Sequence, residues 1–199
     1  LYATLFDETG ANVLVDSSKS PKRAYLLKQY LKKNYNVKII HLVRDGRAVL
    51  YSYLKGYYKV RIKNPETGDL ENKTFFSNHK RTEAESINIW KKDNKQALLY
   101  HNSVFFGKNG YYFMRYEDFA NYPEKELNKL LNFIGVEYET EMLNLKRYEN
   151  HMVSGNASRI NAQSIEKPFE GWKEQLTEKQ LDYFNRKAKK LNQKFGYQK

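Results

Sequence analysis

An arginine and a serine in residues 37–56, VKIIHLVRDGRAVLYSYLKG, have the side-chain types and the spacing to bind a phosphate. Arg44 follows an apolar run, and Ser52 lies about two turns further along if a helix begins at Asp45. Arginine offers a fixed fork of N–H donors to phosphate oxygens, and serine adds a hydroxyl donor. Small Ala48 lies between them and would leave a groove through which a ligand reaches the backbone. The pattern predicts an anion site, although an arginine capping a strand and a serine on a solvated helix face would also account for it.

Two further segments carry donors that could serve the same ligand. The turn at residues 16–21, DSSKSP, follows an apolar run, and its Lys19 would share a sheet edge with the arginine, because the carboxyl ends of parallel strands meet at one edge. The loop at residues 151–159, HMVSGNASR, combines Gly155, which lets a backbone approach a ligand closely, with Arg159, which offers a second positive charge. Taken alone, either segment could equally be an ordinary surface turn.

The elements that must position these residues alternate between strands and helices, which predicts an α/β fold with a parallel sheet and flanking helices. The strand at 37–43 is rich in β-branched residues and is expected to be buried on both faces of the sheet. Residues 57–80 are polar and predict a long loop. The buried stripe of the first long helix is expected to consist of Leu26, Leu27, Tyr30 and Leu31. The predicted strands span 12–16, 37–43 and 110–116, and the predicted helices span 21–34, 45–56, 81–102, 123–135, 139–148 and 177–196.

The composition limits the class of protein. A chain of 199 residues, 40% hydrophobic and 15% aromatic, suits one folded unit, so we expect a single domain over residues 1–199. The formal charge of +12 predicts attraction to anions, but the lysines are scattered along helices, so much of this charge is expected to be solvated. The lack of cysteine excludes disulfides and thiolate metal sites and favours a cytoplasmic location. No apolar segment approaches the ~20 residues that span a bilayer, so no transmembrane segment is expected.

Five ordered motifs, spread over nearly the whole chain, resemble those of the sulfotransferases that use 3′-phosphoadenosine 5′-phosphosulfate (PAPS). The motifs are DSSKSP at 16–21, HLVRDGRAVLYSYLK at 41–55, Tyr-Glu-Asp at 116–118, a Gly-Asn pair and an arginine at 155–159, and Gly-Trp-Lys at 171–173. The resemblance implies a three-layer fold of the kind found in P-loop nucleotide hydrolases, with a parallel sheet between two layers of helices.

The same resemblance implies a role for each candidate residue. Arg44 and Ser52 would hold the 3′-phosphate of the nucleotide, and Tyr116 would lie against the nucleotide. Lys19 would be catalytic, because its charge could neutralise the bridging oxygen as the phosphate leaves. The other nucleotide contacts would come from Ser18, Gly155, Asn156, Ser158 and Arg159.

The implied reaction moves a sulfuryl group from PAPS to an acceptor hydroxyl, releases 3′-phosphoadenosine 5′-phosphate and needs no metal. The acceptor could be a carbohydrate, a lipid, a small-molecule alcohol or a peptide tyrosine. In the family, the segment that corresponds to 57–80 tends to line the acceptor site. The acceptor candidates are therefore Tyr57, Tyr58, Phe75, Phe76 and His79, of which the histidine could be a general base.

One family element is missing from the sequence. The phosphosulfate-binding loop, a strand followed by a Gly/Ser/Thr-rich turn and a helix, should precede all of these motifs, and no such turn precedes Asn12. We therefore expect the domain to be incomplete at its N-terminus, and the activity of the isolated chain stays open. Because Leu1 is not an initiator methionine, an upstream signal or anchor also stays open, as does the oligomeric state.

Two other functions remain open. A basic nucleic-acid-binding module would explain the charge and the 17 tyrosines but not the charges at strand ends, so no specific nucleic-acid partner is expected. A non-catalytic remnant that binds nucleotides or sulfated partners would fit the missing loop. A nucleotide-dependent phosphotransferase is disfavoured, because the sequence contains no G-x-x-x-x-G-K-[ST] motif.

Overall fold

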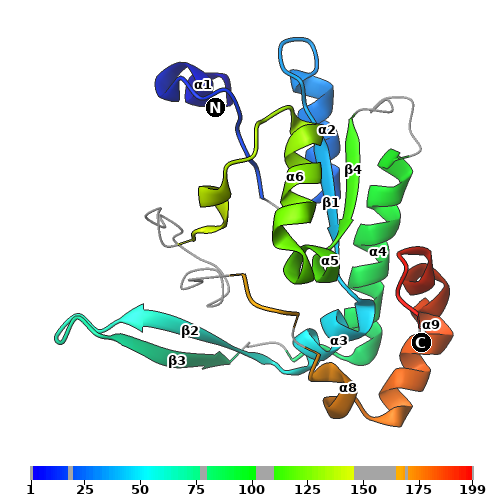
Figure 1. The fold of residues 1–199 in the computed structure, drawn as a ribbon. Helices are drawn as coiled ribbons and strands as arrows, with labels where there is room; N and C mark the ends of the chain where they lie inside the picture. Colours follow the sequence, from blue (N-terminus) through cyan, green and yellow to red (C-terminus); the bar gives the residue numbers. More distant parts are fainter. Residues whose placement is uncertain are drawn as a thin grey trace.

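Two parallel strands lie at the centre of the molecule, with helices on both sides (Figure 1). The computed structural model describes residues 2–17, 20–76, 80–101, 110–145, 165–168 and 170–198, with only the backbone at 57–63, 70–72 and 75–76. The described elements are, in chain order, α1 (Tyr2–Thr9), α2 (Pro21–Leu31), β1 (Ile39–Val43), α3 (Gly46–Leu54), β2 (Tyr57–Lys63), β3 (Leu70–Phe76), α4 (Glu83–His101), β4 (Tyr111–Arg115), α5 (Tyr116–Asn121), α6 (Pro123–Ile134), the short 3₁₀ helix η1 (Thr140–Leu143), α8 (Trp172–Gln175) and α9 (Glu178–Lys194).

The two faces of the sheet formed by β1 and β4 contact different helices. On one face, His41 of β1 bonds to Asn94 of α4 and packs against Phe195, directly after α9. On the other face, the Tyr112 ring of β4 has its centroid 5.2 Å from that of Phe133 in α6. Helices therefore cover the sheet on both sides, and the predicted three-layer α/β fold is confirmed.

The burial of β1 differs from the prediction. His41 and Val43 are buried, but Ile40 and Leu42 are 39% and 52% exposed. Successive residues of a strand face opposite sides of the sheet, and α6 packs over β4, where Met114 is buried, rather than over β1. The prediction that this strand is buried on both faces was therefore wrong.

The strand predicted at residues 12–16 does not form. These residues make no strand ladder with any described part of the chain, and Val13 and Val15 are 43% and 76% exposed. Asp16 instead accepts hydrogen bonds from the Tyr2 hydroxyl and from Arg23 Nε, the latter at 3.2 Å. An apolar run alone cannot make a strand, because the backbone also needs a neighbour with which to pair.

Helix α2 begins where predicted, but none of its side chains is fully buried. Ser20 caps its N-terminus, and the helix ends three residues before the predicted end. Leu26 and Tyr30 of the predicted stripe are 39% and 80% exposed, so that part of the prediction was wrong. The helix is instead oriented by Tyr25, whose ring stacks on Tyr100 of α4 with 5.3 Å between centroids.

The polar segment after α3 forms a hairpin and not the predicted loop. β2 and β3 pair antiparallel, in register from Tyr57 opposite Phe76. Asn64 shapes the turn by accepting the Glu66 N–H at 2.9 Å, and Gly68 adopts the left-handed conformation with φ +75°. Figure 1 shows the hairpin extending from the body of the molecule. The alternation of charged and apolar residues in YKVRIK was the signal that the prediction missed.

The main core lies where α3, α4, α8 and α9 meet at the end of β1. Val43, Leu50, Ile87 and Phe184 are each 1% exposed, and both tryptophans belong to this cluster. Burying such a side chain contributes about 1.5–3 kcal/mol to stability. The core therefore gives the turn between β1 and α3 a rigid base.

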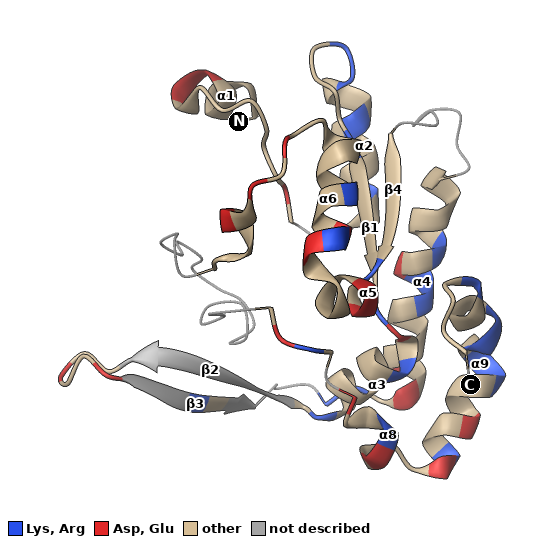
Figure 2. Cartoon of the chain, in the orientation of Figure 1, with Lys and Arg blue, Asp and Glu red and all other residues tan. Residues whose placement is uncertain are grey.

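Basic side chains are distributed over several elements, including α2, α4 and α9, and do not gather at one place (Figure 2). This distribution agrees with the scattered lysines of the sequence. Among the described helices, none combines the length and the apolar character needed to cross a membrane.

Candidate functional site

The carboxyl ends of β1 and β4 bring Arg44 and Tyr116 together. Val43 pairs with Arg115, so the next residue of each strand lies at the same edge of the sheet. The Arg44 guanidinium carbon lies over the Tyr116 ring, 5.0 Å from its centroid. Stacking of this kind is attractive and fixes the plane of the guanidinium. Two of the residues predicted to contact a nucleotide therefore form one unit.

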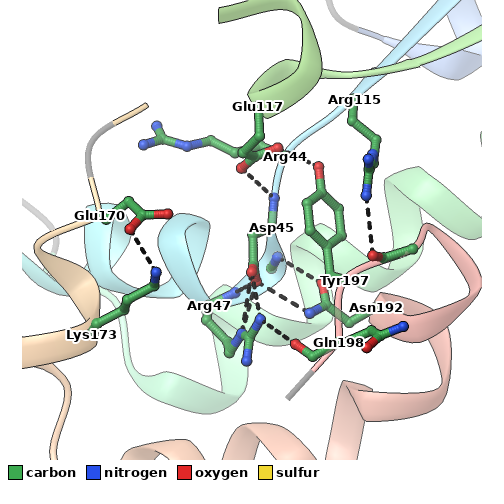
Figure 3. A network of polar contacts seen from close by, with 12 residues as sticks. Arg44, Asp45, Arg47, Arg115, Glu117, Glu170, Lys173, Asn192, Tyr197 and Gln198 are labelled. Atoms are coloured by element: carbon green, nitrogen blue, oxygen red, sulfur yellow. Dashed lines mark hydrogen bonds and ion pairs between the residues drawn. The ribbon is translucent and has the colours of Figure 1, made fainter. Parts of the chain in front are cut away.

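Arg44 keeps unused capacity to donate hydrogen bonds. Its Nε is shielded from solvent and has no hydrogen-bond partner in the described part of the chain. A buried donor without a partner costs about 1–3 kcal/mol, and arginine cannot lose its charge to reduce that cost. Figure 3 shows its guanidinium extending out of the surrounding polar network. An anionic oxygen that reached this donor would satisfy it, and the guanidinium that carries the donor extends out of the network.

Two side chains hold the backbone carbonyl groups of Val43 and Arg44. The indole Nε1 of Trp90 in α4 donates to the Arg44 carbonyl at 3.2 Å. The Tyr197 hydroxyl, which follows α9, lies 3.0 Å from the Val43 carbonyl oxygen. The end of β1 is therefore tied to elements that lie far from it in the sequence.

Two more side chains hold the backbone N–H groups that follow Arg44. Asp45 N–H donates to Glu117 Oε1 of α5 at 3.1 Å. Gly46 N–H donates to Asn192 Oδ1 of α9 at 2.9 Å. The first N–H groups of a helix have no partner within the helix, so these contacts satisfy groups that would otherwise be left open at the start of α3.

The Asp45 carboxylate neutralises a second arginine in the turn. It caps α3 as predicted, by accepting the Arg47 N–H at 2.9 Å, and it binds the Arg47 guanidinium at two points, 3.0 and 2.7 Å. The guanidinium also lies over the Trp172 ring, 4.5 Å from its centroid, and donates to the Gln198 carbonyl at 2.8 Å. Both side chains of the ion pair are largely buried. Arg47 is therefore bound within the fold.

Tyr197 remains a neutral donor at the centre of this network. Its hydroxyl hydrogen-bonds to the Glu117 carboxylate as well as facing the Val43 carbonyl (Figure 3). Burial, and then the hydrogen bond to Glu117, raise the pKa of Tyr197 well above its ordinary value. Beside it, Arg115 pairs with Asp118 at 2.6 Å, and the hydrogen bond to that carboxylate raises the pKa of Arg115.

Ser52 lies on the outward side of α3, and its side chain is exposed. Ala48, one turn before it, is only 3% exposed and belongs to the core. The prediction that this alanine lines an open groove was therefore wrong, because the side of α3 that carries Ala48 packs against α4, α8 and α9. The exposed Ser52 hydroxyl therefore stays a predicted contact of the phosphate.

The other candidate residues lie outside the described residues, so their predicted roles remain predictions. They are Ser18, Lys19, His79, Gly155, Asn156, Ser158 and Arg159. The acceptor candidates Tyr57, Tyr58, Phe75 and Phe76 lie in β2 and β3, of which the structure describes only the backbone.

Sequence reasoning missed Glu117, Asn192 and Tyr197 as parts of the site. Glu117 was visible within the Tyr-Glu-Asp motif, but only the tyrosine of that motif was assigned a role. Asn192 continues the four-residue spacing of Phe184 and Ala188 on the buried face of α9 and is 3% exposed. A polar residue at such a position signals a buried hydrogen-bond partner, and this signal could have revealed it.

Comparison with known proteins identifies the family. The family model described as "Sulfotransferase domain" matches residues 11–196. The chain belongs to the sulfotransferase family. A search of curated proteins found no significant match.

Solved structures support the fold of this sulfotransferase chain. The sulfotransferase domain from the curacin biosynthetic pathway aligns with a TM-score of 0.59 and 19% identity, over 99% of this chain and 67% of that domain. The sulfotransferase domain from the Synechococcus PCC 7002 olefin synthase aligns with a TM-score of 0.58 and 20% identity, over 100% of this chain and 63% of that one. The sulfotransferase chain thus spans about two thirds of the length of these relatives.

Proposed function

We propose that this sulfotransferase binds PAPS and transfers its sulfuryl group to an acceptor hydroxyl of a carbohydrate, a lipid or another alcohol. One observation carries the proposal. At the carboxyl edge of the sheet, Arg44 has a fixed backbone, a guanidinium that stacks on Tyr116, and a buried Nε without a partner among the described residues. A 3′-phosphate supplies the oxygens that such an arginine needs, and Ser52 adds a hydroxyl donor.

In the proposed reaction, the acceptor oxygen forms a bond to sulfur while the bond from sulfur to the bridging oxygen breaks. The electron pair of that bond leaves with 3′-phosphoadenosine 5′-phosphate, and the acceptor proton passes to a base or to water. Lys19 would stabilise the negative charge that develops on the bridging oxygen. Ser18 and the residues Gly155, Asn156, Ser158 and Arg159 would complete the nucleotide contacts, and residues 1–199 would belong to one domain.

Calorimetric binding of 3′-phosphoadenosine 5′-phosphate (PAP) tests the proposal, with adenosine 5′-phosphate as the ligand that lacks the 3′-phosphate. We expect PAP to bind more tightly than adenosine 5′-phosphate. Arg44→Ala should weaken PAP binding by about 1–3 kcal/mol and Ser52→Ala by about 1 kcal/mol, the range measured for charged and neutral hydrogen bonds. Neither variant should change the affinity for adenosine 5′-phosphate.

Lys190→Ala is the matched control, since it removes one positive charge from an exposed position on α9. It should leave the affinity for PAP unchanged. If the folded chain binds both nucleotides equally, or if Lys190→Ala weakens PAP binding as much as Arg44→Ala does, the assignment of Arg44 to a 3′-phosphate is wrong.

A further inference from the structure

We propose that Glu117, acting with Tyr197 and Asn192, is a positioning residue that fixes the turn bearing Arg44, so that the segment directly after α9 helps to set the affinity for a 3′-phosphate. This inference rests on the proposed function, because it assumes that Arg44 binds that phosphate. None of the three side chains needs to touch the ligand for this role.

Glu117 uses its two carboxylate oxygens on two different segments. Oε1 accepts the Asp45 N–H at 3.1 Å, and Oε2 accepts the Tyr197 hydroxyl. The residue before it, Tyr116, carries the ring on which the Arg44 guanidinium stacks. The first two residues of α5 therefore hold the Arg44 side chain through the ring and the N–H of the next residue, Asp45, through the carboxylate.

Tyr197 connects this carboxylate to the strand end. Its hydroxyl has one proton and two acceptors within reach, the Glu117 carboxylate and, at 3.0 Å, the Val43 carbonyl. The tyrosine is 7% exposed, so water competes little for either contact. Loss of the hydroxyl would remove the single proton that these two buried acceptors share.

Asn192 closes the network from the side of α9. Its Oδ1 accepts the Gly46 N–H at 2.9 Å, and its Nδ2 donates to Asp45 Oδ1 at 3.2 Å. One amide thus holds the backbone and the capping side chain at the start of α3. With Glu117, it fixes two consecutive backbone N–H groups directly after Arg44.

The affinity for a phosphate depends on this network because, without it, part of the binding free energy would be needed to order the turn. A guanidinium that is already in place binds without that cost, whereas a mobile one must be fixed during binding. Weakening the network should therefore reduce affinity for the 3′-phosphate even though Arg44 itself is unchanged.

The experiment compares Glu117→Ala, Glu117→Gln and Tyr197→Phe with wild type. Glutamine can keep both contacts, by accepting the Asp45 N–H and donating to the Tyr197 oxygen, whose proton is then free for the Val43 carbonyl. Alanine loses both contacts. Tyr183→Phe is the matched control, since it removes a hydroxyl from the half-buried tyrosine of α9 that lies against Arg186 and Lys187.

Two measurements are made on each variant of the full chain. Calorimetry gives the affinities for PAP and for adenosine 5′-phosphate, and hydrogen exchange without ligand follows the amides of Asp45 and Gly46. We expect Glu117→Ala to weaken PAP binding about tenfold and Tyr197→Phe about three- to tenfold, as for lost buried hydrogen bonds. In these two variants, hydrogen exchange at the amides of Asp45 and Gly46 should become faster. Glu117→Gln should stay within about threefold of wild type, and adenosine 5′-phosphate affinity should be unchanged throughout.

The outcomes separate this inference from the proposed function. If PAP binding requires Arg44 but neither Glu117→Ala nor Tyr197→Phe changes PAP affinity or amide exchange, the positioning role is overturned and the function stands. If exchange rises in these variants while wild type shows no preference for PAP, the proposed function is overturned, and with it the link from Glu117 to phosphate affinity. Equal loss of both nucleotide affinities would also overturn the inference, since it would indicate general destabilisation.

Discussion

Arg44 and Arg47 lie three positions apart in the same turn, yet their surroundings give them different roles. Arg47 has a buried carboxylate partner in Asp45 at 2.7 Å and an indole ring against its guanidinium. Arg44 has a tyrosine ring against its guanidinium and, within the described residues, no partner for its Nε. An anion would gain more from Arg44, because no carboxylate of the described residues forms an ion pair with its guanidinium, whereas Arg47 would first have to leave Asp45.

Replacing Arg44 by lysine tests whether the shape of the guanidinium matters in addition to its charge. Lysine keeps the charge but loses the planar fork of donors and the flat surface that stacks on Tyr116. We expect Arg44→Lys to weaken PAP binding by about 1 kcal/mol, which is less than the loss in Arg44→Ala. Calorimetry measures the affinity of both variants for PAP.

Arg186→Lys is the control for this substitution, because Arg186 also lies over a tyrosine ring, 5.8 Å from the centroid of Tyr183. It should not alter PAP affinity. An Arg44→Lys variant that binds PAP as tightly as wild type would show that charge alone is sufficient.

Gly46 is required for packing and not for a special backbone conformation. A Cβ at this position would lie 2.7 Å from Phe184 Cζ and 3.0 Å from Trp90 Cε2. Both neighbours belong to the buried core, so they have little room to move. We expect Gly46→Ala to lower the free energy of unfolding by about 1–3 kcal/mol, measured by urea denaturation.

Gly135→Ala provides the contrast, since a Cβ there meets nothing within 4 Å but must adopt φ +87° at the end of α6. Backbone strain alone should lower the free energy of unfolding of Gly135→Ala by about 1 kcal/mol. Equal stability of Gly46→Ala and wild type would mean that Phe184 can shift to make room.

At the scale of elements, the site depends on the register of two strands and on the ends of three helices. The pairing of Val43 with Arg115 sets the positions of Arg44 and Tyr116, and the starts of α3 and α5 and the end of α9 supply the polar contacts around them. α9 takes part because it carries Asn192 and leads directly to Tyr197.

Removal of the cap of α9 tests how strongly this helix supports the molecule. Thr177 accepts the Gln180 N–H, and Gln180 in return accepts the Thr177 N–H, which forms a capping box. We expect Thr177→Ala to lower the free energy of unfolding by about 1 kcal/mol, measured by urea denaturation. Lys179→Ala changes an exposed residue in the same turn and should have almost no effect. Equal losses in the two variants would mean that the cap is not the source of the loss.

The features that depend on local chemistry could be predicted from the sequence. The caps at Asp45 and Thr177 and the helix end at Gly135 involve only residues within a few positions of one another, so their side-chain types suffice. Tyr116 entered the predicted site through the resemblance of its Tyr-Glu-Asp motif, and it lies beside Arg44 because both residues follow paired parallel strands.

The features that depend on distant neighbours could not be predicted. The bonds from Asp45 to Glu117 and from Gly46 to Asn192 join residues 72 and 146 positions apart, and no local spacing encodes them. The exposure of Leu42 likewise depends on which strand α6 covers. The apolar run that includes Val15 has no described strand with which to pair. The sequence of the run could not show whether a partner strand lies beside it.

At the scale of the whole molecule, charge and burial act differently. The net charge of +12 is distributed over several helices and favours anions in general, whereas the preference for a particular anion must come from the few fixed donors at the sheet edge. Burial determines how the fold responds to pH, and the group that shows this most clearly is a histidine in the central sheet.

His41 is 9% exposed and bonds to neutral groups on both ring nitrogens, Asn94 Oδ1 at 2.9 Å and the Tyr111 hydroxyl. Burial lowers the pKa of His41 below its usual value of 6.5, and it outweighs the hydrogen bond to Asn94, which raises the pKa; nearby His101 also lowers it. The folded state therefore favours the neutral ring. Below pH 6.5 the unfolded chain takes up a proton at this residue more readily than the folded chain does.

The sign of the pH effect follows from this difference. Stabilisation by neutral His41 is complete above pH 6.5 and is lost as the pH falls from there through the lower pKa of the folded state. We expect the free energy of unfolding, measured by urea denaturation between pH 7.5 and pH 5.5, to fall with a slope of at most about 1.4 kcal/mol per pH unit from this residue. His41→Gln cannot take up the proton, so its stability should fall less steeply over the same interval, whatever its stability at pH 7.5. Parallel curves for the two proteins would show that His41 does not couple folding to protonation, and the decline would then have to come from other groups.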